Sequence, residues 1–397
     1  MKIGIYNANL NTMGGGEKHI GVIAEYLSQK HEVDFICSYA IDKDVLSKKL
    51  NLDLSKVNIK ALNVEHDDPK FSEISADYDF FINSTYFSRL KSKCEKSAML
   101  IFFPWITPHL YPIWLKKALY SVLKSIYGNN QSIGISMIDR LYNSQQKYFK
   151  DKDYISTYQT FIVNSKYTQR WVKKELQVES EIVFPPIDVK EFIPGEKKNI
   201  ILSVGRFFVH SHNKKQLEMI KIFKEMYNVY PEVKSYEYHL CGSVDKDELS
   251  PLYIQKCREE AKGYPVFIHE DISFQDLKVI YSEAKIFWHA SGFGEDPNKN
   301  PDKFEHFGMT TVEAMAAGAV PVVIAYGGQT EIVTDNVNGF LWTTKEELIS
   351  KTINLINNEN QRINLMTKAE KDSKIYSKEK TLEQLKSVLL KIDKLLV

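Results

Sequence analysis

Two glutamates stand on either side of a predicted helix start, where their carboxylates could bind hydroxyl groups of a ligand. Glu305 and Glu313 have seven residues between them, and Gly308 precedes a helix for which we predict Thr310 as the N-cap. The free N–H groups and the dipole of a helix start attract anions, and glycine lets the backbone approach a ligand closely. A phosphate on these N–H groups, with a carboxylate on each side, would suit a sugar nucleotide.

A structural role for the same residues is the alternative interpretation. Thr310 and Glu313 also have the spacing of a capping box, in which Glu313 would only accept a hydrogen bond from a backbone N–H at the helix start. The spacing does not distinguish a ligand-binding glutamate from a capping glutamate, so both interpretations stay open at this point.

A glycine-rich segment near the N-terminus is a second place where a phosphate could approach the backbone. Residues 2–8 predict a strand, Gly14, Gly15 and Gly16 follow it, and an amphipathic helix comes next. Strand, glycine loop and helix in this order favour phosphate binding. His19 stands where a dinucleotide-binding fingerprint would have its third glycine, so the segment does not predict a dinucleotide site. A glycine triplet alone is also compatible with an ordinary turn.

The residues around the two glutamates resemble a known family. The run Glu-His-Phe-Gly that begins at Glu305, with Val-Glu at 312–313 and Ala-Ala-Gly at 316–318, resembles the E-x7-E signature of retaining GT-B glycosyltransferases of the GT4 type. It is especially similar to the mannosyltransferase-like branch, which includes the eukaryotic lipid-linked oligosaccharide enzymes. The likeness covers nearly the whole chain, strongly in its second half and weakly between about residues 111 and 158.

This resemblance implies a role for each residue of the motif. It implies that Glu313 holds the nucleotide ribose and that Glu305 lies against the donor sugar. It also implies that Arg206, after a predicted strand, and a lysine of the next helix clasp the donor diphosphate. Lys214 matches that lysine better than its neighbour Lys215. The other donor-binding positions that the resemblance implies are Gly15, Gly16, Phe307, Gly308, Met309 and Thr310.

The two cations have a physical rationale of their own. Glycosyl transfer develops negative charge on the departing diphosphate, and fixed cations with helix N–H groups stabilise that charge without a metal. The alternative is that Arg206 and Lys214 are surface cations. A Gly-Arg pair at the end of a predicted strand favours the first interpretation, because ligands collect at strand ends in α/β sheets.

The elements that must position these residues alternate between strands and helices. Such alternation predicts an α/β fold with parallel, doubly wound sheets, and its first predicted strands include residues 99–103. With the resemblance it implies a GT-B architecture, in which two Rossmann-like domains face a cleft. We place an acceptor-binding domain at residues 1–190 and a nucleotide-sugar-binding domain at residues 191–375. Residues 376–397 should form a C-terminal helix that packs back on the first domain.

Composition limits the class of protein. A chain of 397 residues can form two domains, and its net charge of +1 argues against nucleic acid as a partner. The four cysteines form no C-x-x-C pair and are interpreted as reduced thiols of a cytoplasmic protein. The N-terminus enters a predicted strand directly, so no signal peptide is expected.

Neither a metal nor a cofactor is expected. Asp77 and Asp79 form a D-x-D string, but it comes before an apolar strand instead of after one, which predicts a structural turn. His210 and His212 lack a third ligand nearby. No pyridoxal phosphate motif is recognisable, which disfavours a phosphorylase.

Two segments have open interpretations. Residues 105–127 mix aromatic residues and lysines, which predicts a helix packed on the domain, an acceptor-binding element, or a peripheral contact with the inner membrane surface. His109 within it is a candidate contact for the donor sugar by resemblance. Residues 292–303 form a polar loop with glycines at its start, which predicts either a mobile lid or acceptor-facing flap, or an ordinary exposed loop.

We therefore expect a metal-independent, retaining hexosyltransferase. Its donor would be a nucleotide diphosphate sugar, either GDP-mannose or a UDP-hexose, and its acceptor a glycan or a lipid-linked sugar. Two alternatives stay open: a nucleotide-sugar isomerase or hydrolase on the same scaffold, and a non-catalytic nucleotide-binding scaffold.

Overall fold

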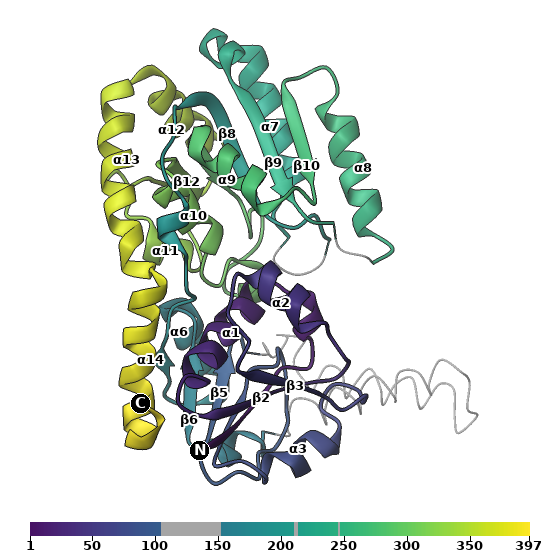
Figure 1. Cartoon of the computed structure of the whole chain (residues 1–397). Helices are drawn as coiled ribbons and strands as arrows, with labels where there is room; N and C mark the ends of the chain where they lie inside the picture. The colour runs from purple at the N-terminus through teal and green to yellow at the C-terminus, as the bar shows by residue number, and fades with distance from the viewer. Residues whose placement is uncertain (105–151, 210–212, 245–246) are drawn as a thin grey trace, which may run out of the picture.

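The computed structural model describes residues 1–104, 152–209, 213–244 and 247–397. The described chain forms two domains, each built around one sheet of parallel strands with helices on both faces (Figure 1). The predicted α/β architecture of two doubly wound sheets is therefore confirmed.

The first sheet has the strand order β3-β2-β1-β4-β5-β6-β7 within the described residues. Its strands are β1 Lys2–Tyr6, β2 Glu32–Cys37, β3 Val57–Ala61, β4 Phe80–Asn83, β5 Ser97–Ile101, β6 Thr160–Val163 and β7 Glu181–Ile182. One apolar cluster joins one face of the sheet to three helices, namely α1 Gly15–Leu27, α2 Lys43–Leu50 and α14 Lys378–Ile392. The opposite face packs on α3 Pro69–Ser75 and α6 Lys166–Leu176.

The second sheet has the strand order β10-β9-β8-β11-β12-β13 within the described residues. Its strands are β8 Lys198–Val204, β9 Glu237–Gly242, β10 Val266–Glu270, β11 Ala284–His289, β12 Val320–Ile324 and β13 Phe340–Trp342. One face packs on α7 Gln216–Val229, α8 Ser250–Ala261 and α12 Lys345–Asn357. The other packs on α9 Phe274–Glu283 and α10 Met309–Ala316, with α11 Gln329–Ile332 and α13 Glu359–Ser373 beside them.

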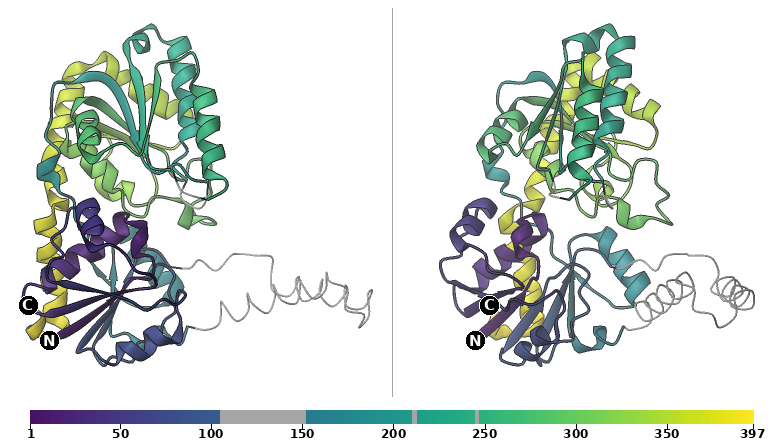
Figure 2. Two further views of the ribbon diagram at one scale, coloured as in Figure 1. Left: turned by 45° about the vertical axis from the view of Figure 1, so that its right-hand side comes forward. Right: turned by 90° about the vertical axis from the view of Figure 1, so that its right-hand side faces the viewer.

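The chain passes between the domains twice, and the two passages lie side by side. The N–H of Ile187 donates to the carbonyl of Tyr376 at 3.2 Å, and the N–H of Lys378 donates to the carbonyl of Ile187 at 3.1 Å. Beyond this point α14 runs along the first domain (Figure 2) and buries Leu385 and Leu389 in the same cluster as β1. The C-terminal helix therefore belongs to the core of the first domain.

The predicted strand at residues 99–103 was wrong by two residues, because β5 spans Ser97–Ile101. Its neighbour β6 ends at Val163, which pairs with the last residue of β5, so the ladder offers no further backbone partner. Side chains replace that partner: Asn164 Nδ2 and Thr168 Oγ1 each donate to the carbonyl of Phe102 at 3.2 Å. Phe102 therefore lies outside the sheet, beside the loops at the carboxyl edge of the sheet.

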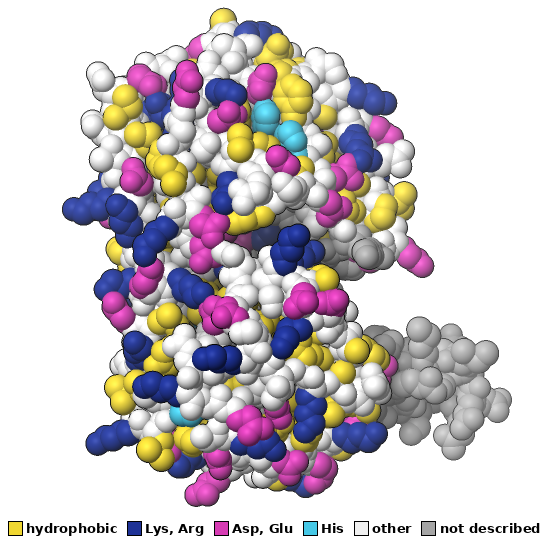
Figure 3. Space-filling view, viewed as in Figure 1, with side chains coloured by type: hydrophobic (Ala, Val, Ile, Leu, Met, Phe, Trp, Pro, Cys, Tyr) yellow, Lys and Arg dark blue, Asp and Glu magenta, His cyan; other side chains and the backbone are white. Residues whose placement is uncertain are grey.

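Surface and thiol chemistry add little to the choice of function. Basic and acidic side chains are mixed over both domains on the face shown in Figure 3. All four cysteines are buried and free. None of the helices in the described ranges is long and apolar enough to cross a bilayer.

Candidate functional site

The second sheet has a topological switch point at β8, which lies between β9 and β11. In doubly wound sheets, ligands bind beyond the carboxyl ends of the strands at such a point. Gly205 and Arg206 directly follow β8, and His289 is the last residue of β11. The fold therefore brings a cation and an imidazole to the edge where this kind of sheet accommodates ligands.

Glu305 lies at this edge between a lysine and a histidine. Its Oε2 is 2.5 Å from Lys214 Nζ and 3.0 Å from His289 Nε2. Burial alone would raise the pKa of Glu305, but Lys214 and His289 outweigh burial and hold that pKa well below its ordinary value. Burial lowers the pKa of His289, so its neutral ring donates Nε2–H to the carboxylate. Neither contact uses Oε1 of Glu305, which can accept a hydrogen bond from a hydroxyl group of a ligand.

Lys214 reaches Glu305, whereas the adjacent Lys215 points to a different carboxylate. Lys215 is the N-cap of α7, with a left-handed backbone at a φ of 57°, and its Nζ lies 3.2 Å from Glu295 Oε1. A Cβ on Gly205 would lie 2.7 Å from Cγ of Lys214, so a glycine is required there to leave room for the lysine stem. The left-handed backbone at Lys215, just before α7, therefore accompanies two neighbouring lysines that reach different carboxylates.

Arg206 lies at the same strand end but is exposed to solvent. Its guanidinium carbon is 5.1 Å from the ring centroid of Phe208. Gln216 Nε2 donates to the carbonyls of Gly205 and Arg206 at 3.2 and 3.0 Å, which fixes this turn to the start of α7. An exposed, always charged guanidinium in this position can bind an anionic group in solvent-accessible space.

The helix that carries the second glutamate begins two residues earlier than predicted. Gly308, not Thr310, is the N-cap of α10, and its φ of 122° is a conformation that other residues rarely adopt. A Cβ on Gly308 would also lie 2.7 Å from Gln329 Nε2. No side chain caps the start of α10, so Met309 and Thr310 lie in its first turn with Phe307 just before it. The N–H groups of this turn form the anion-binding end of the helix.

Glu313 does not form the capping box that was its alternative interpretation. Its Oε2 accepts a hydrogen bond from Tyr281 Oη on α9 at 2.9 Å, and α10 has no capping box. Burial raises the pKa of Glu313, although Lys18 and the tyrosine hydroxyl act in the opposite direction. A half-buried carboxyl group that is oriented by a tyrosine one helix away is suited to bind a polar ligand group.

The glycine loop of the first domain faces this helix start. A Cβ on Gly15, the first residue of α1, would lie 2.7 Å from Met309 Sδ, and a Cβ on Gly16 would lie 3.2 Å from the ring of Phe102. One turn further along α1, Lys18 Nζ lies 2.5 Å from Asp188 Oδ2 of the interdomain passage. The starts of α1 and α10 thus converge from the two domains, and both contribute positive potential to the same place.

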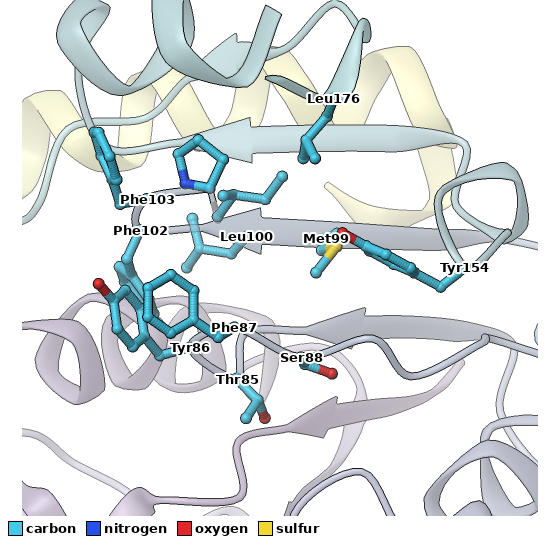
Figure 4. A pocket seen from close by; sticks show the side chains of 12 residues that line it. Thr85, Tyr86, Phe87, Ser88, Met99, Leu100, Phe102, Phe103, Tyr154 and Leu176 are labelled. Atoms are coloured by element: carbon cyan, nitrogen blue, oxygen red, sulfur yellow. The ribbon is translucent and has the colours of Figure 1, made fainter. Parts of the chain in front are cut away.

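A small hollow lies in the first domain beyond β4 and β5 (Figure 4). Aromatic side chains line much of it, including Tyr86, Phe87, Phe102 and Phe103. The hydroxyl group of Tyr86 is buried without a hydrogen-bond partner among the described residues. This pocket adjoins the Glu305 segment, since the ring of Phe103 stacks on that of His306 with centroids 4.1 Å apart.

The remaining predictions have mixed outcomes. His109, His210, His212 and residues 105–127 lie outside the described residues. Asp79 Oδ2 accepts the N–H of Lys2 at 2.7 Å, which is the structural role predicted for the D-x-D string. No cluster of three or more possible metal ligands occurs in the described parts of the chain. In the polar loop at 292–303, Glu295 pairs with Lys303 of the same loop at 2.9 Å and with Lys215 before α7 at 3.2 Å.

Three residues of the site were missed in the sequence: His289, Tyr281 and Lys18. His289 ends a predicted strand, so the rule that ligands lie at strand ends could have identified it. Lys18 follows the glycine triplet by two residues, so its place beside a predicted phosphate-binding loop could have identified it. Tyr281 lies inside a helix, and no local pattern distinguishes it from a packing residue.

Comparison with known proteins finds a family model and curated relatives to which parts of this chain are similar. Residues 186–372, which hold most of the second domain, match the family model described as glycosyl transferases group 1. A curated relative from Dictyostelium discoideum, GDP-Man:Man(3)GlcNAc(2)-PP-Dol alpha-1,2-mannosyltransferase, is 28% identical over 261 residues. That alignment covers 60% of this chain and 49% of the relative, so the chain spans about half the length of that protein.

Solved structures resemble the whole chain. A glycosyltransferase from Rickettsia africae superposes with a TM-score of 0.66 at 15% identity, covering 99% of this chain and 98% of that one. HepE from Anabaena, in complex with UDP, superposes with a TM-score of 0.65 at 13% identity, covering 98% of this chain and 100% of that one. The fold is therefore GT-B. The family match and the curated relatives support an enzyme of the transferase class.

Proposed function

We propose that this protein is a retaining glycosyltransferase of the GT4 type that moves a hexose from a nucleotide diphosphate sugar to an acceptor hydroxyl group. The observation that carries the proposal is the placement of Glu305 between Lys214 and His289, beside the uncapped start of α10. This arrangement offers one carboxylate to a sugar and a cation with helix N–H groups to a phosphate. The match of residues 186–372 to the glycosyl transferases group 1 model supports it.

In this proposal the diphosphate lies between the starts of α10 and α1. Arg206 and Lys214 pair with its oxygens, and the N–H groups at Gly308, Met309 and Thr310 donate to it. These groups stabilise the negative charge that develops as the bond between the anomeric carbon and the diphosphate oxygen breaks. Glu313 accepts a hydrogen bond from the ribose, while Gly15 and Gly16 allow the diphosphate to approach the first domain.

Glu305 supports the sugar itself. Its Oε1 accepts a hydrogen bond from a hydroxyl group of the donor hexose, while Lys214 and His289 hold Oε2. The acceptor oxygen attacks on the face that the leaving group vacates, and its proton passes to the departing diphosphate oxygen. The anomeric configuration is therefore retained, and charge is balanced without a metal ion in this proposal.

The acceptor is a glycan or lipid-linked sugar that reaches the site from the first domain. The aromatic residues beyond β4 and β5 provide apolar surface, and one of them, Phe103, stacks on His306 beside Glu305; such surface suits the faces of sugar rings. GDP-mannose and UDP-hexoses are the donors to test first. The named curated relative uses GDP-Man on a dolichol-linked acceptor, and we extend this to the chain only as a proposal, with action at a membrane surface.

A donor screen tests the proposal. The protein is incubated with GDP-mannose, UDP-glucose, UDP-N-acetylglucosamine and ADP-glucose in the presence of EDTA, with and without glycan acceptors, and release of nucleoside diphosphate is measured. Nuclear magnetic resonance of the product gives its anomeric configuration. We expect acceptor-dependent release and retention, and loss of both in Glu305→Ala.

The same screen separates the alternatives. Release that does not depend on an acceptor would indicate a nucleotide-sugar hydrolase, and a rearranged sugar an isomerase. Nucleotide binding without turnover of any donor would indicate a scaffold. A product of inverted configuration would refute the retaining mechanism.

A further inference from the structure

Both chain neighbours of Glu305 are buried against the first domain, although Glu305 itself belongs to the second. The side chain of Phe304 is fully buried in a cluster with Phe103 and Tyr167 of the first domain. On the other side of Glu305, the ring of His306 stacks on Phe103 at an interplanar angle of 8°. The proposed sugar-binding carboxylate is thus held at both sides by residues of the opposite domain.

Hydrogen bonds from α6 reinforce this contact. Ser165 Oγ, at the start of α6, donates to the carbonyl of His306 at 2.6 Å. Tyr167 Oη donates to the carbonyl of Pro301 at 2.9 Å. Together they hold the segment from Pro301 to His306 along its length, and Glu305 lies inside it.

A carboxylate of the second domain completes the contact. Glu331 accepts hydrogen bonds from the N–H groups of Lys166 and Tyr167 at 2.8 and 2.5 Å, so it occupies the start of α6 as a capping residue would. A negative charge at a helix start is favoured by the helix dipole, and a shielded site strengthens the effect. Tyr376 Oη donates to the carbonyl of Glu331 at 2.9 Å and holds this residue within the second domain.

We propose that Glu331, Ser165 and Tyr167 form an interdomain latch that positions Glu305 for sugar transfer. The catalytic part of this inference rests on the proposed function. The diphosphate and ribose groups of the donor are assigned mainly to Arg206 and to α10, neither of which contacts α6 through these bonds. Breaking the latch should therefore slow transfer much more than it weakens nucleotide binding.

Glu331→Gln tests the latch because it preserves side-chain size, removes the charge and turns one acceptor oxygen into an N–H donor. Glu347→Gln is the matched control. Glu347 Oε2 also accepts a backbone N–H, from Thr343 at 2.6 Å, but entirely within the second domain and away from the site. Tyr167→Phe is a milder second variant, since it removes only the hydroxyl group bound to Pro301.

Three measurements are made on the full chain: kcat for transfer, Kd for the nucleoside diphosphate by calorimetry, and hydrogen exchange of peptides that cover residues 301–308 and 165–168. We expect Glu331→Gln to lower kcat about tenfold or more, as misplacement of a positioned group does, and to change Kd less than about twofold. Both peptides should exchange faster. Tyr167→Phe should change the same quantities in the same direction but less, and Glu347→Gln should match the wild type.

Normal kcat in Glu331→Gln, or a loss of nucleotide binding in proportion to kcat, would overturn the latch. So would equal losses in the Glu347→Gln control. If the wild type turns over no donor, the proposed function fails. The exchange measurements still decide the latch in that case, because unchanged protection at residues 301–308 in Glu331→Gln would refute it.

Discussion

Gly15 and Met309, the first residues of α1 and α10, meet across the two domains. A Cβ on Gly15 would lie 2.7 Å from Met309 Sδ, closer than the two atoms can approach without movement. Two helix starts therefore converge where the proposed donor diphosphate lies, and the pair offers a direct test of that convergence.

Gly15→Ala should impair donor use without unfolding the protein. Alanine is compatible with the helical conformation of this residue, but its methyl group would displace Met309 or separate the domains. We expect KM for the donor to rise about tenfold or more, measured by steady-state kinetics. Met309→Ala in the same chain should restore a substantial part of the loss, because it removes the clashing sulfur. If the double variant is no better than Gly15→Ala, the contact is not the cause.

Lys214→Met and Lys215→Met should differ, although the two residues are adjacent. Lys214 lies at the Glu305 carboxylate, whereas Lys215 is bound to Glu295. We expect kcat to fall about 100-fold or more in Lys214→Met, as for the loss of one electrostatic group at a leaving group. In Lys215→Met, kcat should fall less than about fivefold. Equal losses would contradict the assignment, and circular dichroism would verify that both variants fold.

Arg206→Ala should weaken use of the donor at little cost in stability. The side chain is exposed, so its removal opens no cavity in the core. We expect kcat/KM for the nucleotide sugar to fall about 10- to 100-fold with loss of a charge-assisted contact to the diphosphate. The melting temperature should stay close to that of the wild type. Unchanged kcat/KM would remove Arg206 from the site.

Tyr281→Phe should affect the nucleotide more than the chemical step. The substitution removes only the hydroxyl group that donates to Glu313 at 2.9 Å. We expect Kd for the nucleoside diphosphate to rise severalfold, because Glu313 loses the hydrogen bond that orients its carboxyl group, while kcat at saturating donor changes little. A fall in kcat with unchanged Kd would contradict the assignment of Glu313 to the ribose.

His19 should make the first domain sensitive to acid. Burial lowers the pKa of His19 to about 3, from an ordinary value of 6.5, and neither ring nitrogen has a hydrogen-bond partner among the described residues. Between these two pKa values the unfolded chain binds the proton and the folded chain does not. The stability conferred by the neutral ring is therefore complete above pH 6.5 and is lost as the pH falls toward 3.

His19→Met tests this dependence by removing the titrating ring. Lowering the pH from 6.5 to 5 should cost the wild type about 2 kcal/mol more than it costs the variant, at roughly 1.4 kcal/mol for each pH unit. Urea unfolding at pH 7 and pH 5 measures the difference. Identical pH dependence in both proteins would show that His19 is not the responsible group.

Much of the fold was predictable because its signals are local. Alternating apolar runs and helix faces predicted two doubly wound sheets, and the residues around Glu305 and Glu313 form one continuous segment. The exact ends of elements were less predictable. Thr310 looked like an N-cap by residue type, but the positive φ of Gly308 placed the helix start earlier. Phe102 has strand propensity, yet it leaves the sheet because its neighbour strand has ended.

The chemistry of single residues could be inferred from the linear order, because a motif keeps its members within a few positions of one another. Which residues contact one another in the folded protein could not be inferred in this way. Glu305 meets Lys214 and His289 only because β8 and β11 are neighbours at a switch point. Glu331 reaches α6 only when both domains are folded and in contact. Interactions of this kind join positions far apart in the chain, and their geometry arises from packing, which no local pattern encodes.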